Sequence, residues 1–423
     1  MQTTLRRFST SLRYRDNRVF WYGTSLSSVG QGAFVVAASW LAYELGGSGA
    51  VGIVTFATMI PFILATPLGG MLADRADRRT IILTCQVIQS SMALLLAVQS
   101  LFAAVPFPQL ALLVFITGMS RAVELPTTAA VLPNLVPREA LLNSFSLNSL
   151  ATLGARFTGP VVILPLLALG GATSAFFVVT AVYIPAFILT RRVPPQRASG
   201  IVAVTFGEQV REGMHYVRTH ASVALILGIV VLHCGLTMSF DSTLPLFAED
   251  NLGGSSTVYS AIVAAVGLGS IAGTLGLAGM RSTTRRGALL FVSALGGGMF
   301  PLLLAVANVV PVALAVLFAL GATQAVFMTL CFTLVQESAP DHLRGRANGI
   351  MLMAAGGIMS FTNLGNGYLA DRFGVVPVLG IPAFIFVVAL ILLSLGRPAL
   401  RRIYRDGALP SEVYGGATAA AGD

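Results

Sequence analysis

Residues 69–79 read GGMLADRADRR, and the last six positions hold two acids and three arginines. Apolar runs flank this charged part at Val51–Ala73 and Thr80–Phe102. Each run has about the 20 residues that a helix needs to cross the hydrocarbon core of a bilayer. The stretch therefore predicts two transmembrane helices that are joined by a short charged loop at one membrane surface.

The composition points to a membrane protein over most of the chain. Of the 423 residues, 55% are hydrophobic and only 10% are charged. Soluble domains carry about 25% charged residues, so a water-soluble globular protein is excluded, as is disorder outside the tails. Cys85, Cys234 and Cys331 all fall inside apolar runs. A disulfide framework is therefore not indicated.

Twelve apolar runs are long enough to span a bilayer, where the backbone must satisfy its own hydrogen bonds and therefore forms helices. The runs are Val19–Tyr43, Val51–Ala73, Thr80–Phe102, Leu110–Leu132, Phe145–Ala168, Ala172–Thr190, Val223–Phe247, Val258–Gly279, Ala288–Val306, Val312–Val335, Ala347–Ala370 and Val375–Leu395. The predicted fold class is an all-α membrane protein with twelve transmembrane helices in two pseudo-symmetric six-helix bundles.

A faint internal repeat supports two related halves. The pair Arg78-Arg79, with a glycine nine positions before it, recurs 207 positions later as Arg285-Arg286 with a glycine at the same distance. Parallel halves are typical of transporters whose binding site lies near the bilayer midplane between them. We expect a cytoplasmic N-terminal segment (1–18), an N-terminal bundle (19–190), a linker (191–222), a C-terminal bundle (223–396) and a disordered cytoplasmic tail (397–423). The pattern at Phe206–Val217 predicts an amphipathic linker helix.

The arginines predict the orientation of the chain. All 26 basic residues are arginine, and 23 of them fall on the inner side if the N-terminus is cytoplasmic. Only Arg372 falls on the outer side, and Arg121 and Arg156 lie within spans. Both termini are therefore expected in the cytoplasm, with the protein in the inner (plasma) membrane. The net charge of +9 then reflects topology, and nucleic acid is not an expected partner.

Arg121 and Glu124 are charged residues within the fourth predicted span, where each costs roughly 2.5–3.5 kcal/mol without a partner. They are three positions apart and share a helix face. They could form a self-neutralising pair that fixes the helix. They could instead bind substrate or exchange a proton in a central cavity. Arg156, in the fifth span, is an alternative partner for Glu124.

Asp241 lies well into the seventh predicted span, eight positions or about two turns after His233. A carboxylate at that depth suits a carrier that binds and releases a proton. The alternative is an acid in an outer vestibule, since Glu249 and Asp250 follow closely. For His233 itself, helix packing is the favoured interpretation.

Gly159-Pro160 in the fifth span predicts a bend, because proline removes a helical hydrogen bond. The pair could serve as a hinge or in packing. Neither a CxxC pair nor a phosphate-binding loop occurs, and the histidines are scattered. We therefore expect no metal, no cofactor and no enzymatic activity.

Several motifs resemble those of a known family. The pattern GxxxDRxxRR, formed by Gly70, Asp74, Arg75, Arg78 and Arg79, resembles the cytoplasmic signature loop of the major facilitator superfamily. The segments YELxxSxxxG (43–52), PxLVPRE (133–139) and QExxPDxLRGR (336–346) are similar to the branch that contains enterobactin exporters and macrolide efflux pumps. The resemblance covers roughly residues 15–396.

The resemblance implies a monomeric secondary transporter that works by alternating access. Proton-coupled export of a small amphipathic or hydrophobic compound is expected, such as a drug, a macrolide or a siderophore-like molecule. It also implies that Asp74 docks on the start of the eleventh helix, near Arg346–Asn348, where the positive end of the helix dipole attracts a carboxylate. The five loop residues would then form a cytoplasmic gate.

The sequence also departs from the family pattern. Asp77 stands where the loop usually has glycine, and Gln31 stands where related exporters often have an acid. A glutamine cannot carry a proton. A facilitator or importer of a metabolite or lysolipid, without proton antiport, is therefore the alternative function.

Overall fold

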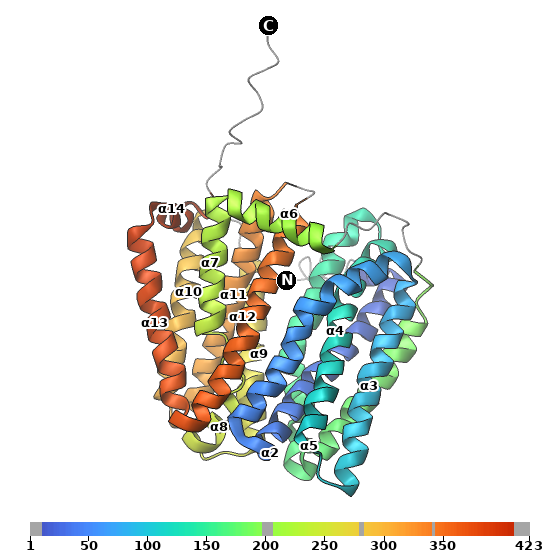
Figure 1. The fold of residues 1–423 in the computed structure, drawn as a ribbon. Coiled ribbons are helices and arrows are strands. Elements are labelled where there is room, and N and C mark those ends of the chain that lie inside the picture. Colours follow the sequence, from blue (N-terminus) through green and yellow to red (C-terminus); the bar gives the residue numbers. More distant parts are fainter. Residues whose placement is uncertain (1–10, 197–205, 279–282, 341–342, 410–423) are drawn as a thin grey trace.

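The computed structural model describes residues 11–196, 206–278, 283–340 and 343–409, and these contain helices and short connections but no strand (Figure 1). The elements are η1 (Ser11–Arg13), α2 (Arg15–Arg75), α3 (Arg78–Phe102), α4 (Phe107–Leu135), α5 (Arg138–Arg191), α6 (Phe206–Thr219), α7 (Ala221–Leu236), α8 (Leu244–Leu246), the π-helical turn η2 (Phe247–Asn251), α9 (Ser256–Ala278), α10 (Thr283–Ala305), α11 (Val310–Ser338), α12 (Arg344–Phe373), α13 (Val375–Gly396) and α14 (Pro398–Asp406). Parts of the predicted N-terminal segment, linker and tail lie outside the described residues.

Two of the helices turn back on themselves at glycines. In α2, which has 61 residues, the helix is interrupted at Gly46 and Gly47, and Gly47 has a φ of 65°. In α5, Gly171 has a φ of 61°. A left-handed backbone of this kind strongly favours glycine, because other residues have a Cβ atom that clashes. Figure 1 shows α2 running along the molecule and returning beside itself, so one label covers two antiparallel segments.

Other helix boundaries are also encoded locally. Pro108 and Pro311 lie in the first turns of α4 and α11, where a missing N–H has no helical partner to lose. The side chain of Asp77 accepts a hydrogen bond from the Arg79 N–H and caps α3. Gly374, with a φ of 79°, separates α12 from α13.

By length and apolar composition, nine helices of the described residues could cross a membrane. The count is ten if the bent pair Glu139–Thr152 and Phe157–Leu167, within α5, is one span. The segment Arg15–Ile63 of α2 counts once although it reverses at its glycines. The 30-residue helix α12 is not in this set, because its asparagines and glycines lower its mean hydropathy. The structure thus agrees with an all-α membrane protein.

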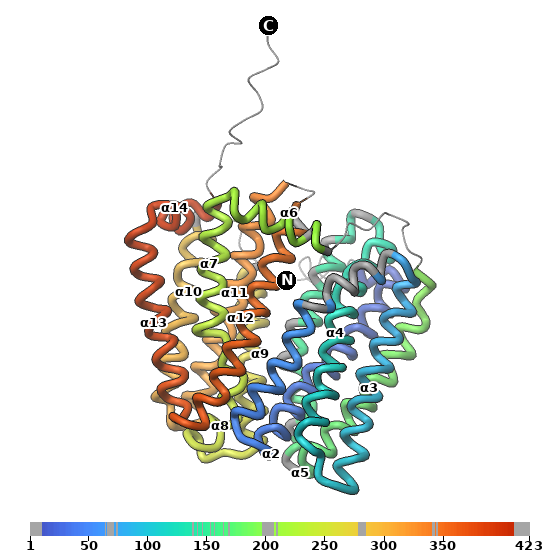
Figure 2. The backbone as a smooth tube through the Cα atoms, viewed as in Figure 1, coloured from blue at the N-terminus to red at the C-terminus, as the bar shows by residue number. Residues whose placement is uncertain are grey.

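The helices gather into two groups, one formed by α2–α5 and the other by α7–α13 (Figures 1 and 2). Close glycine crossings recur in both. Gly118 of α4 meets the carbonyls of Ala57 and Thr58 of α2, and Gly321 of α11 meets the carbonyl of Val266 of α9. A side chain at either glycine would collide with these backbone atoms. The crossing in the first group therefore has a counterpart in the second.

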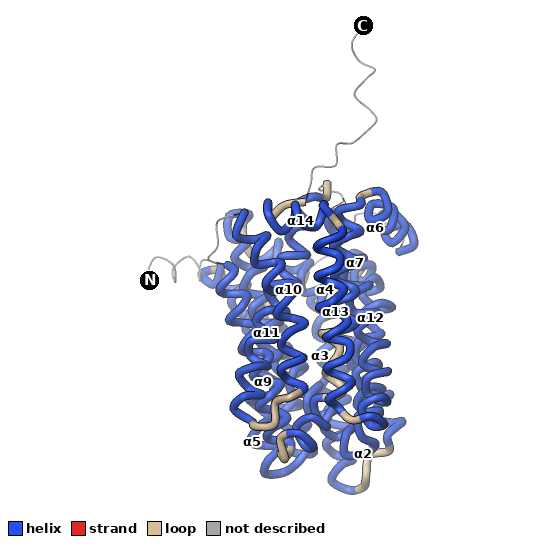
Figure 3. Tube along the Cα trace, turned by 90° about the vertical axis from the view of Figure 1, so that its left-hand side faces the viewer, coloured by secondary structure: helices blue, strands red, loops and turns tan. Residues whose placement is uncertain are grey.

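The two ends of the molecule differ. We name them the α6 end, where α6 and α14 lie, and the α8 end, where α8 and the turn of α2 lie (Figures 1 and 3). At the α8 end one hydrophobic cluster includes both groups, and Trp40 stacks on Tyr259 with ring centroids 5.6 Å apart. At the α6 end each group has its own cluster, around Phe20 and Ile82 in the first group and Tyr216 in the second. Within the described part of the chain, the groups are thus packed together mainly at the α8 end.

The prediction of a disordered tail from 397 onward is wrong for its first part. Residues 398–406 form α14, in which Leu400 and Ile403 are fully buried while Arg401 and Arg402 are exposed. Two apolar side chains three positions apart are enough to bury one face of a short helix. Residues 410–423 lie outside the described part of the chain.

Candidate functional site

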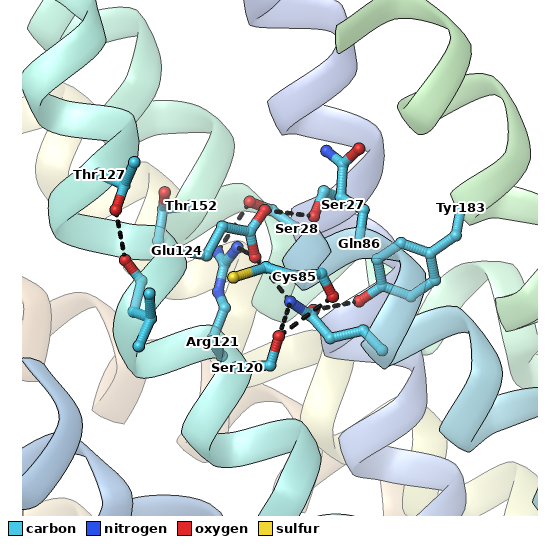
Figure 4. A network of polar contacts seen from close by, with 12 residues as sticks. Ser27, Ser28, Cys85, Gln86, Ser120, Arg121, Glu124, Thr127, Thr152 and Tyr183 are labelled. Carbon is cyan, nitrogen blue, oxygen red and sulfur yellow. Dashed lines mark hydrogen bonds and ion pairs between the residues drawn. The ribbon is translucent and has the colours of Figure 1, made fainter. Parts of the chain in front are cut away.

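Arg121 and Glu124 form an ion pair within α4 (Figure 4). Arg121 Nη1 lies 2.9 Å from Glu124 Oε2, and only 1% of Glu124 is exposed. The i, i+3 spacing places the two side chains on one helix face. The side chain of Arg156 is outside the described set, so the alternative pairing has no structural test.

Neighbouring helices bind both members of the pair. The Ser27 hydroxyl donates to Glu124 Oε1 at 2.8 Å, and Gln89 Nε2 donates to Glu124 Oε2 at 2.9 Å. Arg121 Nη2 donates to the Ser28 hydroxyl at 3.0 Å. Both carboxylate oxygens therefore have donors, which is what allows a buried ion pair to be tolerated. The pair joins α4 to α2 and α3.

The network extends further across the first helix group. The Tyr183 hydroxyl, from the second part of α5, donates to Gln89 Oε1 at 2.6 Å. The Ser120 hydroxyl donates to the backbone carbonyl of Cys85 at 3.1 Å. Sequence reasoning missed Ser27, Gln89 and Tyr183. Their only signal was that they are polar side chains within apolar runs.

Asp241 lies in an interruption between α7 and α8 and is half-buried. The prediction of one continuous seventh helix, with Asp241 two turns after His233, is wrong because α7 ends at Leu236. Residues 237–243 are not helical. Asp241 lies in the second helix group, whereas the Arg121–Glu124 pair lies in the first.

Polar side chains of α11 and α12 satisfy the backbone at this interruption. Asn363 Oδ1 accepts a hydrogen bond from the Ser242 N–H at 3.2 Å, and Asn366 Nδ2 donates to the Ser239 carbonyl at 2.6 Å. Gln324 Nε2 donates to another carbonyl of the interruption at 3.3 Å. Non-helical backbone at membrane depth requires such partners. The two asparagines also explain part of the low hydropathy of α12.

His233 packs inside the second helix group, as the favoured interpretation predicted. It is fully buried, and its ring lies 4.3 Å from that of Phe327 and 5.0 Å from that of Phe386, centroid to centroid. Its Nδ1 is 2.8 Å from the Thr237 hydroxyl. Within the described ranges, no group of three or more His, Cys, Asp or Glu side chains could hold a metal ion.

Two arginines of the charged loop, Arg78 and Arg79, bind backbone carbonyls of the first helix group. Arg78 is buried, and its Nη1 donates to the carbonyl of Ala130 in α4 at 2.7 Å. Arg79 Nη1 donates to the carbonyl of Val193, just beyond α5, at 3.0 Å. Arg75 is exposed. These contacts fasten the loop to the first helix group.

The side chain of Asp74 and the surroundings of Gly70 lie outside the described set, so the predicted contact with the start of α12 is untested. Arg346, near the expected docking point, forms an ion pair with Glu212 of α6. The Oδ1 atom of Asn348 is buried and has no hydrogen-bond partner. The start of α12 is thus engaged by the linker helix.

Asp77 has a structural role that accounts for the departure from glycine. Burial opposes its charge, but the hydrogen bonds from the Thr80 hydroxyl and from the Gln196 and Arg79 N–H groups, with the Arg79 charge, outweigh it. Together they hold the pKa of the Asp77 carboxyl below its usual range. The residue caps α3 and ties the segment after α5 to the loop.

Gly159 lies where α5 crosses the first part of α2. A Cβ atom there would come within 2.6 Å of the Ala33 nitrogen, and one at Gly32 would collide with the Ala155 carbonyl. The first part of α5 is bent by 40° between Thr152 and Phe157, one turn before Pro160. Gly159 therefore permits a backbone-to-backbone crossing beside a bend.

Comparisons with known proteins agree with this architecture. The family model described as transmembrane secretion effector matches residues 9–412. The chain is 22% identical over 355 residues to the staphyloferrin A transporter of Staphylococcus aureus (strain NCTC 8325 / PS 47), covering 77% of this chain and 82% of that protein. It is 24% identical over 340 residues to the multidrug efflux pump Tap of Mycolicibacterium fortuitum, with the same coverage. It is 26% identical over 296 residues to the enterobactin exporter EntS of Salmonella choleraesuis (strain SC-B67), covering 67% and 68%.

Solved structures share the fold at low identity. The nucleoside transporter NupG is 13% identical with a TM-score of 0.71, covering 92% of this chain and 99% of that one. A D-xylose–proton symporter is 17% identical with a TM-score of 0.71, covering 90% and 97%. The family consists of multi-pass membrane transporters rather than enzymes. The chain belongs to the transmembrane secretion effector family of the major facilitator superfamily.

Proposed function

We propose that this protein is a secondary transporter with twelve transmembrane helices in two six-helix bundles, working by alternating access. The observation that carries the proposal is the difference between its ends. Among the described side chains, the two helix groups share one hydrophobic cluster at the α8 end but have separate clusters at the α6 end. Rocking the groups about the midplane would exchange these arrangements.

The α6 end is proposed to face the cytoplasm, with both termini on that side of the plasma membrane. The exposed or half-exposed arginines of the loop after α2 and of α14 lie there, in agreement with the excess of basic residues in cytoplasmic loops. The arrangement described here is then the inward-open state, with the outer side closed.

The proposed activity is export of a small amphipathic or hydrophobic compound. The named relatives include a multidrug efflux pump and an enterobactin exporter, and other relatives are macrolide efflux proteins. At 22–26% identity these relatives support the substrate class and do not identify one compound.

Asp241 is proposed to exchange the coupling proton. Glu124 is less suited to that step in this state, because Arg121 neutralises it and both of its oxygens accept hydrogen bonds. Asp241 is half-buried beside an interrupted helix, and interrupted helices form the coupling-ion sites of many transporters. Arg121, Glu124 and Arg156 remain proposed as a charged set that responds to substrate, and Gly159-Pro160 as a hinge.

The test uses purified protein in proteoliposomes with radiolabelled erythromycin and, separately, ethidium. With a pH gradient imposed, we expect accumulation that an uncoupler abolishes. Asp241→Asn should lose gradient-driven accumulation by roughly tenfold or more while retaining exchange of labelled for unlabelled compound, because only the proton-carrying group is removed. The matched control is Asp250→Asn, an exposed carboxylate nearby, which should behave as wild type.

Accumulation that ignores both the uncoupler and Asp241→Asn would contradict proton antiport. Exchange without any gradient-driven accumulation by the wild type would favour the facilitator. The facilitator is favoured by Gln31, which stands where related exporters often have an acid and cannot carry a proton. Its Oε1 is buried and has no hydrogen-bond partner.

A further inference from the structure

The sequence pattern at the end of α2 recurs at the end of α12. Gly70, Asp74 and Arg75 form GxxxDR, and Gly367, Asp371 and Arg372 form the same six-residue pattern. Each copy ends a long helix: the first closes α2 at residue 75, and the second lies at the end of α12, which finishes at residue 373. The second copy is at the α8 end, opposite the charged loop.

In the structure, the carboxylate of Asp371 is docked on a helix start. Its Oδ1 accepts a hydrogen bond from the Ser48 N–H at 2.7 Å, and its Oδ2 accepts one from the Gly49 N–H at 2.6 Å. These are N–H groups at the start of the second segment of α2, just after the glycine turn. The N–H groups in the first turn of a helix have no hydrogen-bond acceptor within the helix, and the positive end of the helix dipole lies there.

Glycines around this contact leave room for the Asp371 carboxylate. Gly47 has a φ of 65°, and a Cβ atom on it would lie 2.9 Å from Asp371 Oδ1. A Cβ atom on Gly49 would lie 3.0 Å from Asp371 Oδ2. Gly367, one turn before the aspartate, meets the carbonyl of Ser48 so closely that any side chain would collide with it. Glycines on both helices therefore make the approach possible.

The docked carboxylate joins the two helix groups. The second segment of α2 and α12 lie side by side across the boundary between the groups, running in opposite directions (Figure 1). Further along, Gly52 meets the carbonyl of Asn363, and the rings of Phe56 and Phe361 lie 5.3 Å apart. Asp371 is thus at the outermost point of this contact.

The two copies of the pattern are placed reciprocally. From Ser48 to Asp74 the chain advances 26 positions, and from Arg344 to Asp371 it advances 27. Antiparallel helices of equal length put each aspartate level with the start of the other helix. The N-cap residue of α12, Leu343, does not itself cap the helix with its side chain. By this symmetry the start of α12, at the α6 end, corresponds to the docking place that Asp371 occupies at the α8 end.

We propose that Asp371 is a latch that holds the α8 end closed, and that it alternates with the Asp74 contact implied at the α6 end. Since the two groups rock, closing one end separates the helices at the other, so only one aspartate is docked at a time. This inference rests on alternating access but assigns a residue that the family resemblance does not. Asp371 acts by positioning the helices and does not contact substrate.

The test measures opening at the α8 end directly. Ser48→Cys places a thiol at a fully buried side chain under the latch while keeping the backbone N–H. In proteoliposomes, a membrane-impermeant maleimide should label it slowly. Asp371→Asn should raise the labelling rate by roughly tenfold, the factor expected when one or two hydrogen bonds to a charged group are lost. Asp250→Asn, an exposed carboxylate at the same end, should leave the rate unchanged.

Folding is checked in the same samples through Cys331, which is fully buried in the second helix group and should stay unlabelled. If Asp371→Asn exposes Cys331, Gly49→Ala is the second variant, because its methyl group would crowd Asp371 Oδ2 at 3.0 Å while Asp371 itself is retained. It should also raise the Ser48→Cys rate. Unchanged labelling in a folded variant of either kind overturns the latch.

The outcome is separable from that of transport. Faster labelling of Ser48→Cys in Asp371→Asn, without any accumulation of erythromycin or ethidium by the wild type, would support the latch and contradict the proposed export. Normal proton-driven accumulation with unchanged labelling would support the proposed export and contradict the latch.

Discussion

Arg121→Met should lower the free energy of unfolding by roughly 3–5 kcal/mol, because it leaves a buried carboxylate without its counter-charge. Glu124 is almost completely buried, and Arg121 is its ion-pair partner at 2.9 Å. The hydrogen bonds from Ser27 and Gln89 remain, but these donors are neutral and do not balance the charge of the carboxylate. The measurement is the folded fraction in detergent after heating, followed by size-exclusion chromatography.

The double variant Arg121→Met with Glu124→Gln should recover most of this loss. The neutral glutamine keeps an acceptor for Ser27 and adds no uncompensated charge. Two single losses that simply add in the double variant would contradict a mutual pair. If the double variant is stable and still transports, the pair is a structural element. Restored stability without transport would instead assign the pair to the transport cycle.

Gly159→Ala should destabilise the protein by about 3 kcal/mol, the upper end of the usual cost of overpacking. The added methyl group would lie 2.6 Å from the backbone nitrogen of Ala33, and backbone atoms cannot move aside as a flexible side chain can. The helices α2 and α5 would have to separate. The same heating assay measures the effect.

Gly154→Ala is the matched control on the same helix, because among the described atoms its Cβ would meet only Ile271 Cδ1 at 3.8 Å. It should change stability little. Equal losses at both glycines would mean that helix propensity, rather than the crossing, decides the result. Pro160→Ala separates a hinge from packing: a hinge role predicts unchanged stability with a changed transport rate.

Much of the helical fold was predictable because membrane spans are recorded in the sequence as long apolar runs. The runs Thr80–Phe102 and Val375–Leu395 match α3 and α13 within two residues at either end. The interruption after Leu236 was not predictable, since the residues that satisfy it come from α11 and α12. The helix α14 was missed because its buried face rests on only two side chains.

The candidate site was predictable only where it is local. The spacing of Arg121 and Glu124 on one helix predicts their pairing, and the structure has that pair. The contributions of Ser27 and Gln89 depend on helix packing, and no sequence spacing encodes it. The position of Asp371 against Ser48 likewise follows from the contact between α2 and α12. Charge placement alone indicated only that Arg372, the neighbour of Asp371, lies on the outer side.

The most direct test of alternating access is the distance between spin-label pairs at the two ends, measured by double electron–electron resonance. The exposed pair Asn134 and Arg401 reports on the α6 end, and the exposed pair Ala104 and Asn308 reports on the α8 end. The native cysteines are all buried, so labels attach mainly at introduced cysteines.

On adding erythromycin or changing pH, we predict that the Asn134–Arg401 distance shortens while the Ala104–Asn308 distance lengthens in the same molecules. Rigid groups rocking about the midplane require this opposite response. Distances that stay fixed at both ends, or that change in the same direction, would contradict alternating access by this protein.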